Sequence, residues 1–363
     1  MNIVMVGLSI TSSWGNGHAT TYRCLTRGLV ERGHHICFLE RNKPWYASHR
    51  DFAGIPGCDV HLYETILELQ ERFEDTIVHA DAVIVGSYVP DGISIGEWVT
   101  SFARGVSAFY DVDTPITLDA LRGDTCFYLT PDLVRAYDLY LSFTGGSTLK
   151  DLEQSWGARY ARPLYCSVDP HVYFPEAVRR RWDLGYLGTY ASDRQAFLSS
   201  LLGAFAKEST RRFVVAGPQY PHTIRWPENV ERIEHLAPGD HRLFYAQQRF
   251  TLNLTRAAMI KAGYSPSVRL FEAAACGVPI ITDRWAGIET FFIPDEEILL
   301  AESAEQVMAI LRDYSAEESA AIGNRARERV LRSHTSTHRT EELEEMIGQV
   351  ARSKRSLPQE VLL

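Results

Sequence analysis

Short apolar segments alternate along the chain with longer segments in which apolar residues recur every three or four positions. The apolar segments of the N-terminal half predict strands at Ile3–Ser9, Ile36–Glu40, Val60–Tyr63, Ala82–Ser87, Val106–Val112 and Leu139–Thr144. Amphipathic stretches between them, such as Thr20–Glu31 and Ile66–His79, predict helices. This alternation is typical of βαβ units and predicts a mostly parallel sheet with helices on both faces.

A second series of the same kind follows after a break. Its predicted strands are Leu184–Leu187, Arg212–Ala216, Val230–His235, Phe250–Leu254, Val278–Thr282 and Glu297–Leu300. Its predicted helices are Arg194–Lys207, Arg269–Ala275, Ala304–Tyr314 and Ala316–Arg332. Between the two series, Ser167–Pro175 contains two prolines and is typical of a linker.

We therefore expect an α/β chain with two Rossmann-like domains. The first covers residues 1–166, a linker covers 167–182, and the second covers 183–335. A C-terminal helical segment over 336–363 could pack back on the first domain. In open parallel sheets, ligands bind beyond the carboxyl ends of the strands. We expect the two sheets to face each other across a deep cleft, with functional residues in the loops that follow strands.

Composition and charge narrow the class of protein. The chain has 363 residues and a formal net charge of −9, which disfavours nucleic acid as the main partner. Its six cysteines form no CxxC pair and no zinc-type spacing, so we expect reduced thiols and a cytoplasmic location. No apolar run approaches the ~20 residues that span a bilayer, and Met1–Gly7 is typical of a strand, not of a signal peptide.

A glycine-containing loop follows the first predicted strand and opens a helix. Its central residues are Gly15, Asn16 and Gly17. Glycines let a ligand approach the backbone, and a helix start favours anionic groups, so these residues are candidates for binding a nucleotide or diphosphate. Two alternatives stay open. One is a dinucleotide-binding turn in which Glu40 binds a ribose, and the other is a loop that only turns the chain.

Three side chains are candidates for proton transfer in the N-terminal domain. His18 begins the helix after the glycine loop and could act as a base or donate a hydrogen bond, with a capping or structural histidine as the alternative. Asp111 and Asp113 lie two positions apart after a strand, and in extended chain their carboxylates would point the same way. Their alternative is an Asx-type turn ahead of Pro115. No third carboxylate lies nearby in the sequence, and we predict no metal site.

The second domain opens with small residues followed by an arginine. Gly188 and Thr189 follow a strand and leave space at the start of a helix that carries Arg194. A guanidinium suits bidentate contact with phosphate, whereas a surface ion pair is the structural alternative for Arg194. Gly217 follows the next strand, where we expect the base of a nucleotide to stack.

The most specific pattern lies further along the same domain. Its candidate residues are Asn253, Arg256, Ser267, Val268, Arg269 and Glu272. Ser267 is suited to cap a helix whose first amides would then be free to bind a diphosphate. Glu272 lies inside an otherwise apolar stretch and needs a partner, which ribose hydroxyls would supply. The alternative is an internal Arg269–Glu272 pair.

Residues 272–279, Glu-Ala-Ala-Ala-Cys-Gly-Val-Pro, resemble a motif of retaining GT-B glycosyltransferases of the family-four type. The linker pattern Val-Asp-x-x-x-Tyr-x-Pro at 168–175 is similar to the interdomain segment of that family. Ser267–Gly277 and Leu184–Arg194 resemble segments of the CgeB/YkvP-like spore-coat group. One departure is Tyr264, which stands eight positions before Glu272, where family four usually has another Glu.

The resemblance implies a GT-B hexosyltransferase that uses a nucleotide sugar, with UDP favoured, as its co-substrate. It further implies that Glu272 binds the ribose of that donor. Because Arg194, Arg256 and the amides at Ser267–Arg269 could hold the diphosphate, we expect no metal or cofactor to take part. The acceptor stays open between a glycan, a protein and a small molecule. Two alternatives also stay open: an NDP-sugar epimerase on the same fold, and a non-catalytic nucleotide-sugar-binding protein.

Overall fold

The computed structural model describes residues 1–15 and 17–356 and divides the chain into two compact units. Unit 1 consists of Met1–Cys166 and the C-terminal segment that starts at Ser336, and unit 2 consists of Ser167–Thr335. Asn16 and residues 357–363, the end of the predicted C-terminal helical segment, lie outside the described residues. Among the residues described, no helix combines the length and the apolar character of a membrane span.

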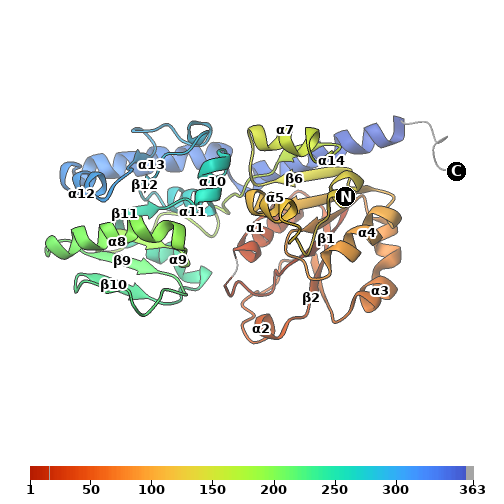
Figure 1. Ribbon diagram of the computed structural model, residues 1–363, viewed down its shortest axis with the longest axis horizontal. Helices are drawn as coiled ribbons and strands as arrows, with labels where there is room; N and C mark the ends of the chain where they lie inside the picture. Colours follow the sequence, from red (N-terminus) through yellow and green to blue (C-terminus); the bar gives the residue numbers. More distant parts are fainter. Residues whose placement is uncertain (16, 357–363) are drawn as a thin grey trace. The chain divides into compact units, whose positions relative to one another are not determined.

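Over its described residues, unit 1 contains a seven-stranded parallel sheet in the order β3-β2-β1-β4-β5-β6-β7 (Figure 1). The strands are β1 (Asn2–Gly7), β2 (His35–Arg41), β3 (Cys58–Tyr63), β4 (Ala82–Gly86), β5 (Val106–Asp111), β6 (Leu139–Ser142) and β7 (Ala161–Pro163). The helices are α1 (His18–Glu31), α2 (Pro44–Ala47), α3 (Ile66–His79), α4 (Gly92–Phe102), α5 (Thr114–Arg122), α6 (Pro131–Ala136), α7 (Ser147–Gln154) and α14 (Ser336–Ser356).

The central strand β1 buries side chains on both faces of this sheet. Val4 and Val6 belong to the apolar cluster that contains residues of α3 and α4. Ile3 and Met5 belong to a second cluster, which contains residues of α1 and α14. A strand that is covered on both faces has no polar side, and this explains its continuous apolar sequence.

Unit 2 repeats the arrangement with a six-stranded parallel sheet over its described residues, in the order β10-β9-β8-β11-β12-β13. The strands are β8 (Trp182–Leu187), β9 (Phe213–Ala216), β10 (Val230–Ile233), β11 (Gln248–Asn253), β12 (Ile280–Thr282) and β13 (Leu299–Leu300). The helices are α8 (Ser192–Lys207), α9 (Pro238–Ala246), α10 (Ala257–Ala262), α11 (Val268–Ala275), α12 (Ala304–Asp313) and α13 (Ala316–Ser333), with a 3-10 turn η1 (Ile288–Thr290). The predicted α/β fold with two Rossmann-like sheets is confirmed.

The strand order of both sheets reverses beside one strand. In unit 1, the chain proceeds from β1 outward to β3 and then returns to β4 on the other side of β1. In unit 2, it proceeds from β8 to β10 and returns to β11 on the other side of β8. Open α/β sheets bind ligands at such a reversal, beyond the carboxyl ends of the strands. These two edges are therefore where ligand-binding residues are expected.

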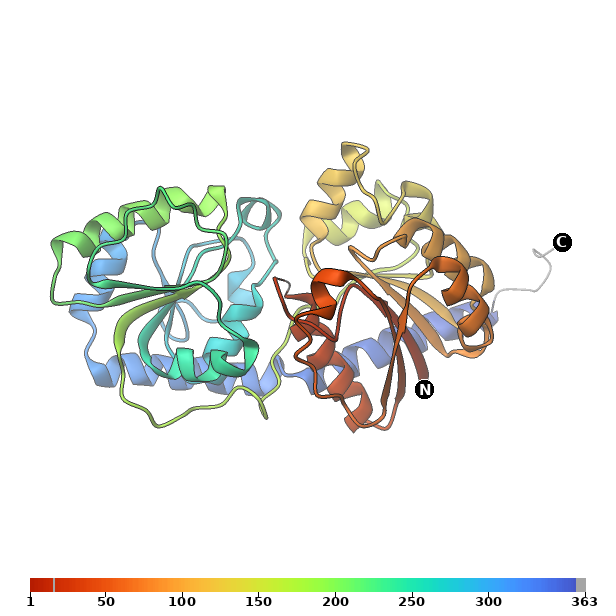
Figure 2. The same cartoon turned by 90° about the horizontal axis from the view of Figure 1, so that it is seen from below.

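Helix α14 packs against α1 on one face of the unit 1 sheet (Figure 2). Gly28 of α1 allows the two helices to approach closely. A Cβ atom at this position would lie 2.5 Å from Oγ1 of Thr340 and 3.0 Å from the carbonyl oxygen of Ser336. The backbone of α14 therefore occupies the space that any side chain at Gly28 would need.

We expect Gly28→Ala to lower the free energy of unfolding by about 1–3 kcal/mol, because the added methyl group overpacks the contact with α14. Urea unfolding followed by circular dichroism measures this change. Gly203→Ala is the matched control. A Cβ at Gly203 in α8 meets no described atom within 4 Å, so the same exchange should be neutral or stabilise by up to ~1 kcal/mol. Equal effects at the two positions would contradict the packing argument.

Candidate functional site

The carboxyl ends of β1, β4 and β5 bring together His18, Tyr88 and Asp113 in unit 1. The Tyr88 hydroxyl donates a hydrogen bond to Oδ2 of Asp113 over 3.0 Å. The rings of Tyr88 and His18 pack edge to face, with their centroids 5.3 Å apart. Tyr88 has φ 63°, a left-handed conformation that is uncommon for a residue with a side chain. Tyr88 is not among the residues predicted from the sequence, although its position directly after a buried strand is the signal that could have identified it.

His18 lacks a partner for one ring nitrogen. Its Nδ1 atom is buried and has no hydrogen-bond partner among the described residues. Burial lowers the pKa of His18 to about 4, while the negative charge of Asp113 acts in the opposite direction. The imidazole is therefore neutral at physiological pH, which is the form that can accept a proton.

Asp111 and Asp113 have different surroundings. β5 ends at Asp111, and the chain turns before Asp113, so the two residues do not lie in the extended segment that the prediction assumed. Asp111 is fully buried and accepts hydrogen bonds from the hydroxyls of Tyr140 over 2.6 Å and Thr117 over 2.8 Å. An Asx-type contact does form, but it starts at Asp111, whose Oδ1 accepts from the Asp113 amide over 3.2 Å. Asp111 is an internal member of this group, and Asp113 is the carboxylate beside His18.

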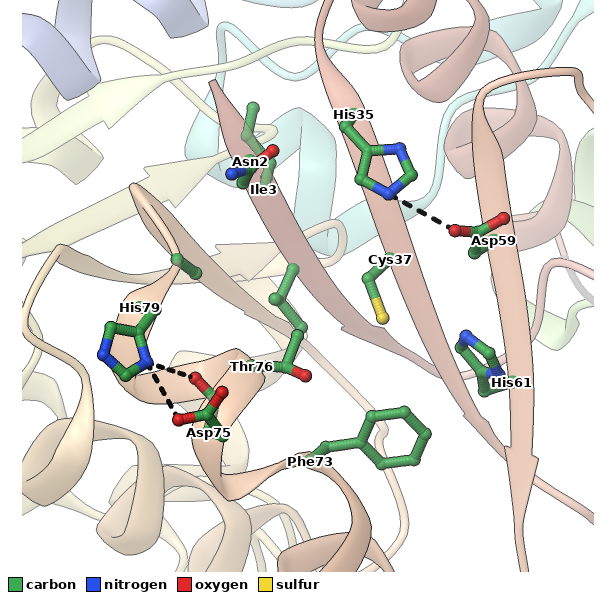
Figure 3. Close-up of a pocket in the computed structure, with 12 residues that line it drawn as sticks. Asn2, Ile3, His35, Cys37, Asp59, His61, Phe73, Asp75, Thr76 and His79 are labelled. Carbon is green, nitrogen blue, oxygen red and sulfur yellow. Dashed lines mark hydrogen bonds and ion pairs between the residues drawn. The ribbon is translucent and has the colours of Figure 1, made fainter.

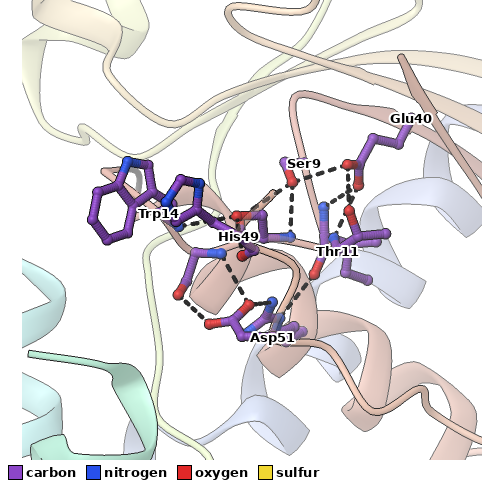
Figure 4. A network of polar contacts seen from close by, with 10 residues as sticks. Ser9, Thr11, Trp14, Glu40, His49 and Asp51 are labelled. Atoms are coloured by element: carbon purple, nitrogen blue, oxygen red, sulfur yellow. Dashed lines mark hydrogen bonds and ion pairs between the residues drawn. The ribbon is translucent and has the colours of Figure 1, made fainter. Parts of the chain in front are cut away.

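The loop between β1 and α1 is held by a buried carboxylate (Figure 4). Oε2 of Glu40 accepts from the amides of Ile10 over 2.7 Å and Thr11 over 2.9 Å. Its Oε1 accepts from the hydroxyls of Thr11 over 2.6 Å and Ser9 over 3.1 Å. Glu40 thus fixes the loop. It is not available to bind a ribose, which is the role that the dinucleotide-binding alternative gives it.

The glycines of this loop lie at its far end. Gly15 is exposed and has φ 65°, and Gly17 is the residue that precedes α1. Gly17, as the residue before α1, has no side chain that could cap the helix. The anion-binding role of this loop stays a prediction.

The carboxyl edge of unit 2 is built from closely packed loop backbones. Gly217 has φ 133°, and a Cβ there would lie 2.2 Å from the carbonyl oxygen of Gly188. A Cβ at Gly188 would lie 2.8 Å from the Tyr186 hydroxyl and 3.1 Å from Nη2 of Arg269. Glycine at both positions is what brings the loops after β8 and β9 against the arginine. Thr189 is exposed beside them.

Two guanidinium groups lie at this edge with unpaired nitrogen atoms. Arg269 donates from Nη1 to Oδ1 of the buried Asn253 over 2.6 Å, and Arg194 donates from Nη2 to the carbonyl oxygen of Thr189 over 2.9 Å. The Nε atoms of both arginines are buried and have no hydrogen-bond partner within the described part of the chain. Burial raises the pKa of Tyr220, and the positive charges of both arginines oppose that rise, so both act on the same hydroxyl.

Helix α11 starts at this edge, as predicted. The Ser267 hydroxyl accepts from the amide of Arg269 over 3.4 Å, and Val268 is the first helical residue. Arg256 is half-buried and precedes α10, whose first amide, at Ala257, donates to Oδ2 of Asp193 over 2.8 Å. The predicted donor-site residues in β11, in α11 and in the loops after β8 and β9 therefore all lie near one reversal of strand order.

Glu272 has an internal partner, but that partner is not Arg269. The side chain is 3% exposed, and its Oε2 accepts from the Tyr245 hydroxyl over 3.1 Å. Nδ1 of His241 lies 3.8 Å from the same oxygen, and the Tyr173 hydroxyl lies 3.3 Å from that nitrogen. The internal Arg269–Glu272 pair is not formed. The carboxylate is nevertheless satisfied without a ribose, so ribose binding by Glu272 stays a prediction.

Tyr264, which replaces a family-four glutamate, has a structural role. Its φ is 47°, and its amide donates to the carbonyl oxygen of Ala286 over 2.6 Å. A Cβ on Gly287 would lie 2.4 Å from the Tyr264 ring, so the aromatic ring fills the space above that glycine. The position supplies packing where a carboxylate would have supplied charge.

A pocket of about 350 Å³ lies at the opposite edge of the unit 1 sheet (Figure 3). It is lined by residues at the amino ends of β1 to β3 and by α3, and no predicted site residue takes part. Its polar groups pair with each other, His35 with Asp59 over 3.3 Å and His79 with Asp75 over 3.1 Å. Burial raises the pKa of Cys37 to about 11, so this thiol is protonated and weakly reactive. Nowhere in residues 1–15 and 17–356 do three or more His, Cys, Asp or Glu side chains form a group able to hold a metal ion.

A family model described as glycosyl transferase-like matches residues 194–345. No curated protein sequence matches the chain. Sucrose-phosphate synthase from Thermosynechococcus elongatus has a similar structure, with a TM-score of 0.71 at 14% identity over 97% of this chain and 100% of that one. An alpha-glucosyltransferase in complex with UDP-glucose and DNA containing an abasic site gives 0.73 at 13% identity over 96% and 99%.

Anabaena HepE in complex with UDP-glucose gives a TM-score of 0.69 at 12% identity over 96% of this chain and 100% of that one. At such identities the structural similarity establishes the fold, which is that of GT-B glycosyltransferases. Together with the family model, it supports a GT-B glycosyltransferase.

The shifted pKa values of Asp111 and His18 predict opposite effects of pH on stability. Burial raises the pKa of Asp111 from 3.8 to about 6, so its contribution to stability is fully present below pH 4 and is lost as the pH rises through 6. Asp111→Asn cannot ionise. Relative to the wild type, we expect its free energy of unfolding to rise by up to about 3 kcal/mol between pH 4 and pH 7.

His18→Gln is the counterpart. The lowered pKa of His18 contributes stability above pH 6.5 that is lost as the pH falls through 4. The free energy of unfolding of this variant should therefore fall relative to that of the wild type as the pH rises from 4 to 7. Urea titrations at half-unit pH intervals measure both differences. Variant and wild-type curves that stay parallel would contradict the assigned burial of these groups.

Proposed function

We propose that the protein transfers a sugar from a nucleoside diphosphate sugar, with UDP favoured, to the hydroxyl group of an acceptor. The observation that carries the proposal is the pair of buried Nε atoms of Arg194 and Arg269 at the strand reversal of unit 2, which have no partner among the residues that the structure describes. A buried donor without an acceptor costs about 1–3 kcal/mol, and a ligand with anionic oxygens at this edge would remove that cost. UDP-glucose and UDP, with which similar structures form complexes, are ligands of this chemistry.

The diphosphate is proposed to lie against the two arginines and the first amides of α11. Positive charge held there stabilises the negative charge that develops on the diphosphate as the bond to the sugar breaks. Arg269 is held in place by Asn253 and lies over the Tyr186 ring, so little reorganisation is needed when the donor binds. In this proposal the arginines supply the charge that a metal ion supplies in other transferases, and the reaction needs no metal or cofactor.

The acceptor hydroxyl is proposed to bind beside His18. Its oxygen attacks the anomeric carbon, the bond from that carbon to the diphosphate breaks, and the nucleoside diphosphate leaves with the bonding electrons. The neutral, unpaired Nδ1 of His18 takes the hydroxyl proton, and Asp113 stabilises the imidazolium that forms. Tyr88 orients Asp113, and Asp111 supports the turn that carries it.

Glu272 and Gly217 complete the proposed donor site. Glu272 is proposed to bind the ribose, with the Tyr245 hydroxyl setting the orientation of its carboxylate. The base is proposed to stack beside the loop at Gly217.

Membership of the CgeB/YkvP-like group is part of the proposal and rests on the pattern at Ser267–Gly277. An epimerase would convert the nucleotide sugar without an acceptor, so analysis of the products separates the two activities.

Arg194→Ala and Arg269→Ala are each expected to weaken UDP binding about 10- to 100-fold, because each removes a charge-assisted hydrogen bond to the diphosphate. Isothermal titration calorimetry with UDP measures the loss. Arg225→Ala, at an exposed arginine of unit 2, should leave the affinity unchanged. If Arg269→Ala does not fold, Arg269→Lys takes its place in the test, because lysine keeps a positive charge near Asn253. UDP affinity that survives both alanine exchanges in folded protein would remove the donor-site assignment.

Glu272→Gln tests the ribose contact separately. If the carboxylate binds the ribose, the wild type should prefer UDP to 2′-deoxy-UDP by about tenfold, and the variant should lose most of that preference. The glutamine can still accept from Tyr245, so the fold should persist. Arg194→Ala should keep the preference, since it acts on the diphosphate. A preference that is unchanged in Glu272→Gln would leave Glu272 with its internal role alone.

A further inference from the structure

Trp14 is an exposed aromatic residue at the carboxyl edge of unit 1, four positions before His18. It is 42% exposed and stacks on the ring of His49, with centroids 4.1 Å apart and planes 19° from parallel. Figure 4 shows the indole ring at the outer end of the polar network. Single exposed apolar side chains are common and need no explanation. This one differs because the buried Ser12 hydrogen-bonds to the backbone of both stacked residues.

The Ser12 hydroxyl joins the two residues of the stack. It donates to the carbonyl oxygen of His49 over 2.7 Å and accepts from the amide of Trp14 over 3.3 Å. Behind it, the loop is fixed by the buried carboxylate of Glu40. A tryptophan held in this way loses little conformational freedom when a ligand covers it, which is the property of a preorganised contact.

Charged and polar groups flank the stack. Asp51 accepts from the Ser13 amide over 3.1 Å and from Nη2 of Arg23 over 2.5 Å. Burial acts to raise the pKa of Asp51, but the hydrogen bonds from Arg23 and Ser13 outweigh it and hold the pKa below its usual value. A flat apolar face beside hydrogen-bonding groups matches a pyranose ring, which has an apolar face of C–H groups and a rim of hydroxyls.

A nucleobase would also stack on an indole ring, and charge decides between these two classes of acceptor. Unit 1 contains 17 Lys and Arg against 25 Asp and Glu, a net charge of −8, whereas unit 2 has a net charge of −1. Binding of nucleic acid depends on cations that neutralise phosphates. The acidic surplus falls on the unit that we assign to the acceptor and opposes a polyanion there.

We propose that the acceptor is an uncharged saccharide whose ring stacks on Trp14 and whose hydroxyls reach the groups around Asp51. This inference rests on the proposed function and adds the class of acceptor to it. The stack then determines acceptor affinity, while donor binding depends on unit 2.

The test uses the full-length protein and isothermal titration calorimetry with maltohexaose, cellohexaose, chitohexaose and a 20-mer DNA in single- and double-stranded form. At least one hexasaccharide should bind the wild type more tightly than either DNA. Trp14→Ala should weaken that binding about tenfold or more, and Trp14→Phe should restore part of it, because the phenyl ring keeps an aromatic face. Phe102→Ala is the matched control, since Phe102 is 46% exposed at the amino-end edge of the same sheet. It should have no effect.

UDP titrations of the same variants keep this inference separate from the proposed function. Trp14→Ala should bind UDP as the wild type does. A wild type that binds no hexasaccharide, a tighter response to DNA, or a Trp14→Ala variant with undiminished saccharide binding would each overturn the saccharide acceptor while the donor site stands. A wild type that does not bind UDP would instead overturn the proposed function and this inference with it.

Discussion

Parallel pairing of strands is the constraint on which both candidate sites depend. In a parallel sheet all strands end at one edge, and the order of each sheet reverses once beside its first strand, at β1/β4 in unit 1 and at β8/β11 in unit 2. The loops after those strands leave the sheet in opposite directions, so side chains from distant parts of the sequence meet there. His18 and Asp113 meet at one reversal, and Arg194 and Arg269 meet at the other.

The buried polar groups of these edges fall into two kinds. The carboxylates of Glu40, Asp111 and Glu272 accept hydrogen bonds from nearby amides or hydroxyls and act as fixed supports. The nitrogen atoms of Arg194 and Arg269, like Nδ1 of His18, are buried without such a partner among the residues described. Buried polar groups are normally satisfied, and our proposal therefore places the ligands against this second kind.

The sequence predicted what depends on local chemistry and missed what depends on distant partners. Strands that are buried on both faces show as apolar runs, and Ser267 caps α11 as its residue type suggests. α4 is not among the helices named from the sequence, and its Gly96 has a role that depends on a distant residue, because a Cβ there would lie 2.7 Å from the Tyr137 hydroxyl. The internal partners of the carboxylates were also beyond prediction. Tyr140 is 29 positions from Asp111, and Tyr245 is 27 positions from Glu272, and only the folded sheet brings them together.

The return of α14 to unit 1 has a consequence for the order in which the chain folds during synthesis. Leu343 and Ile347 of α14 complete an apolar cluster that includes Leu25 and Leu29 of α1. All of unit 2 leaves the ribosome before those two residues do, so unit 2 can finish folding while this face of the first sheet still lacks α14. The apolar side chains that α14 later covers are exposed until then, and exposed apolar surface of this kind binds chaperones or aggregates.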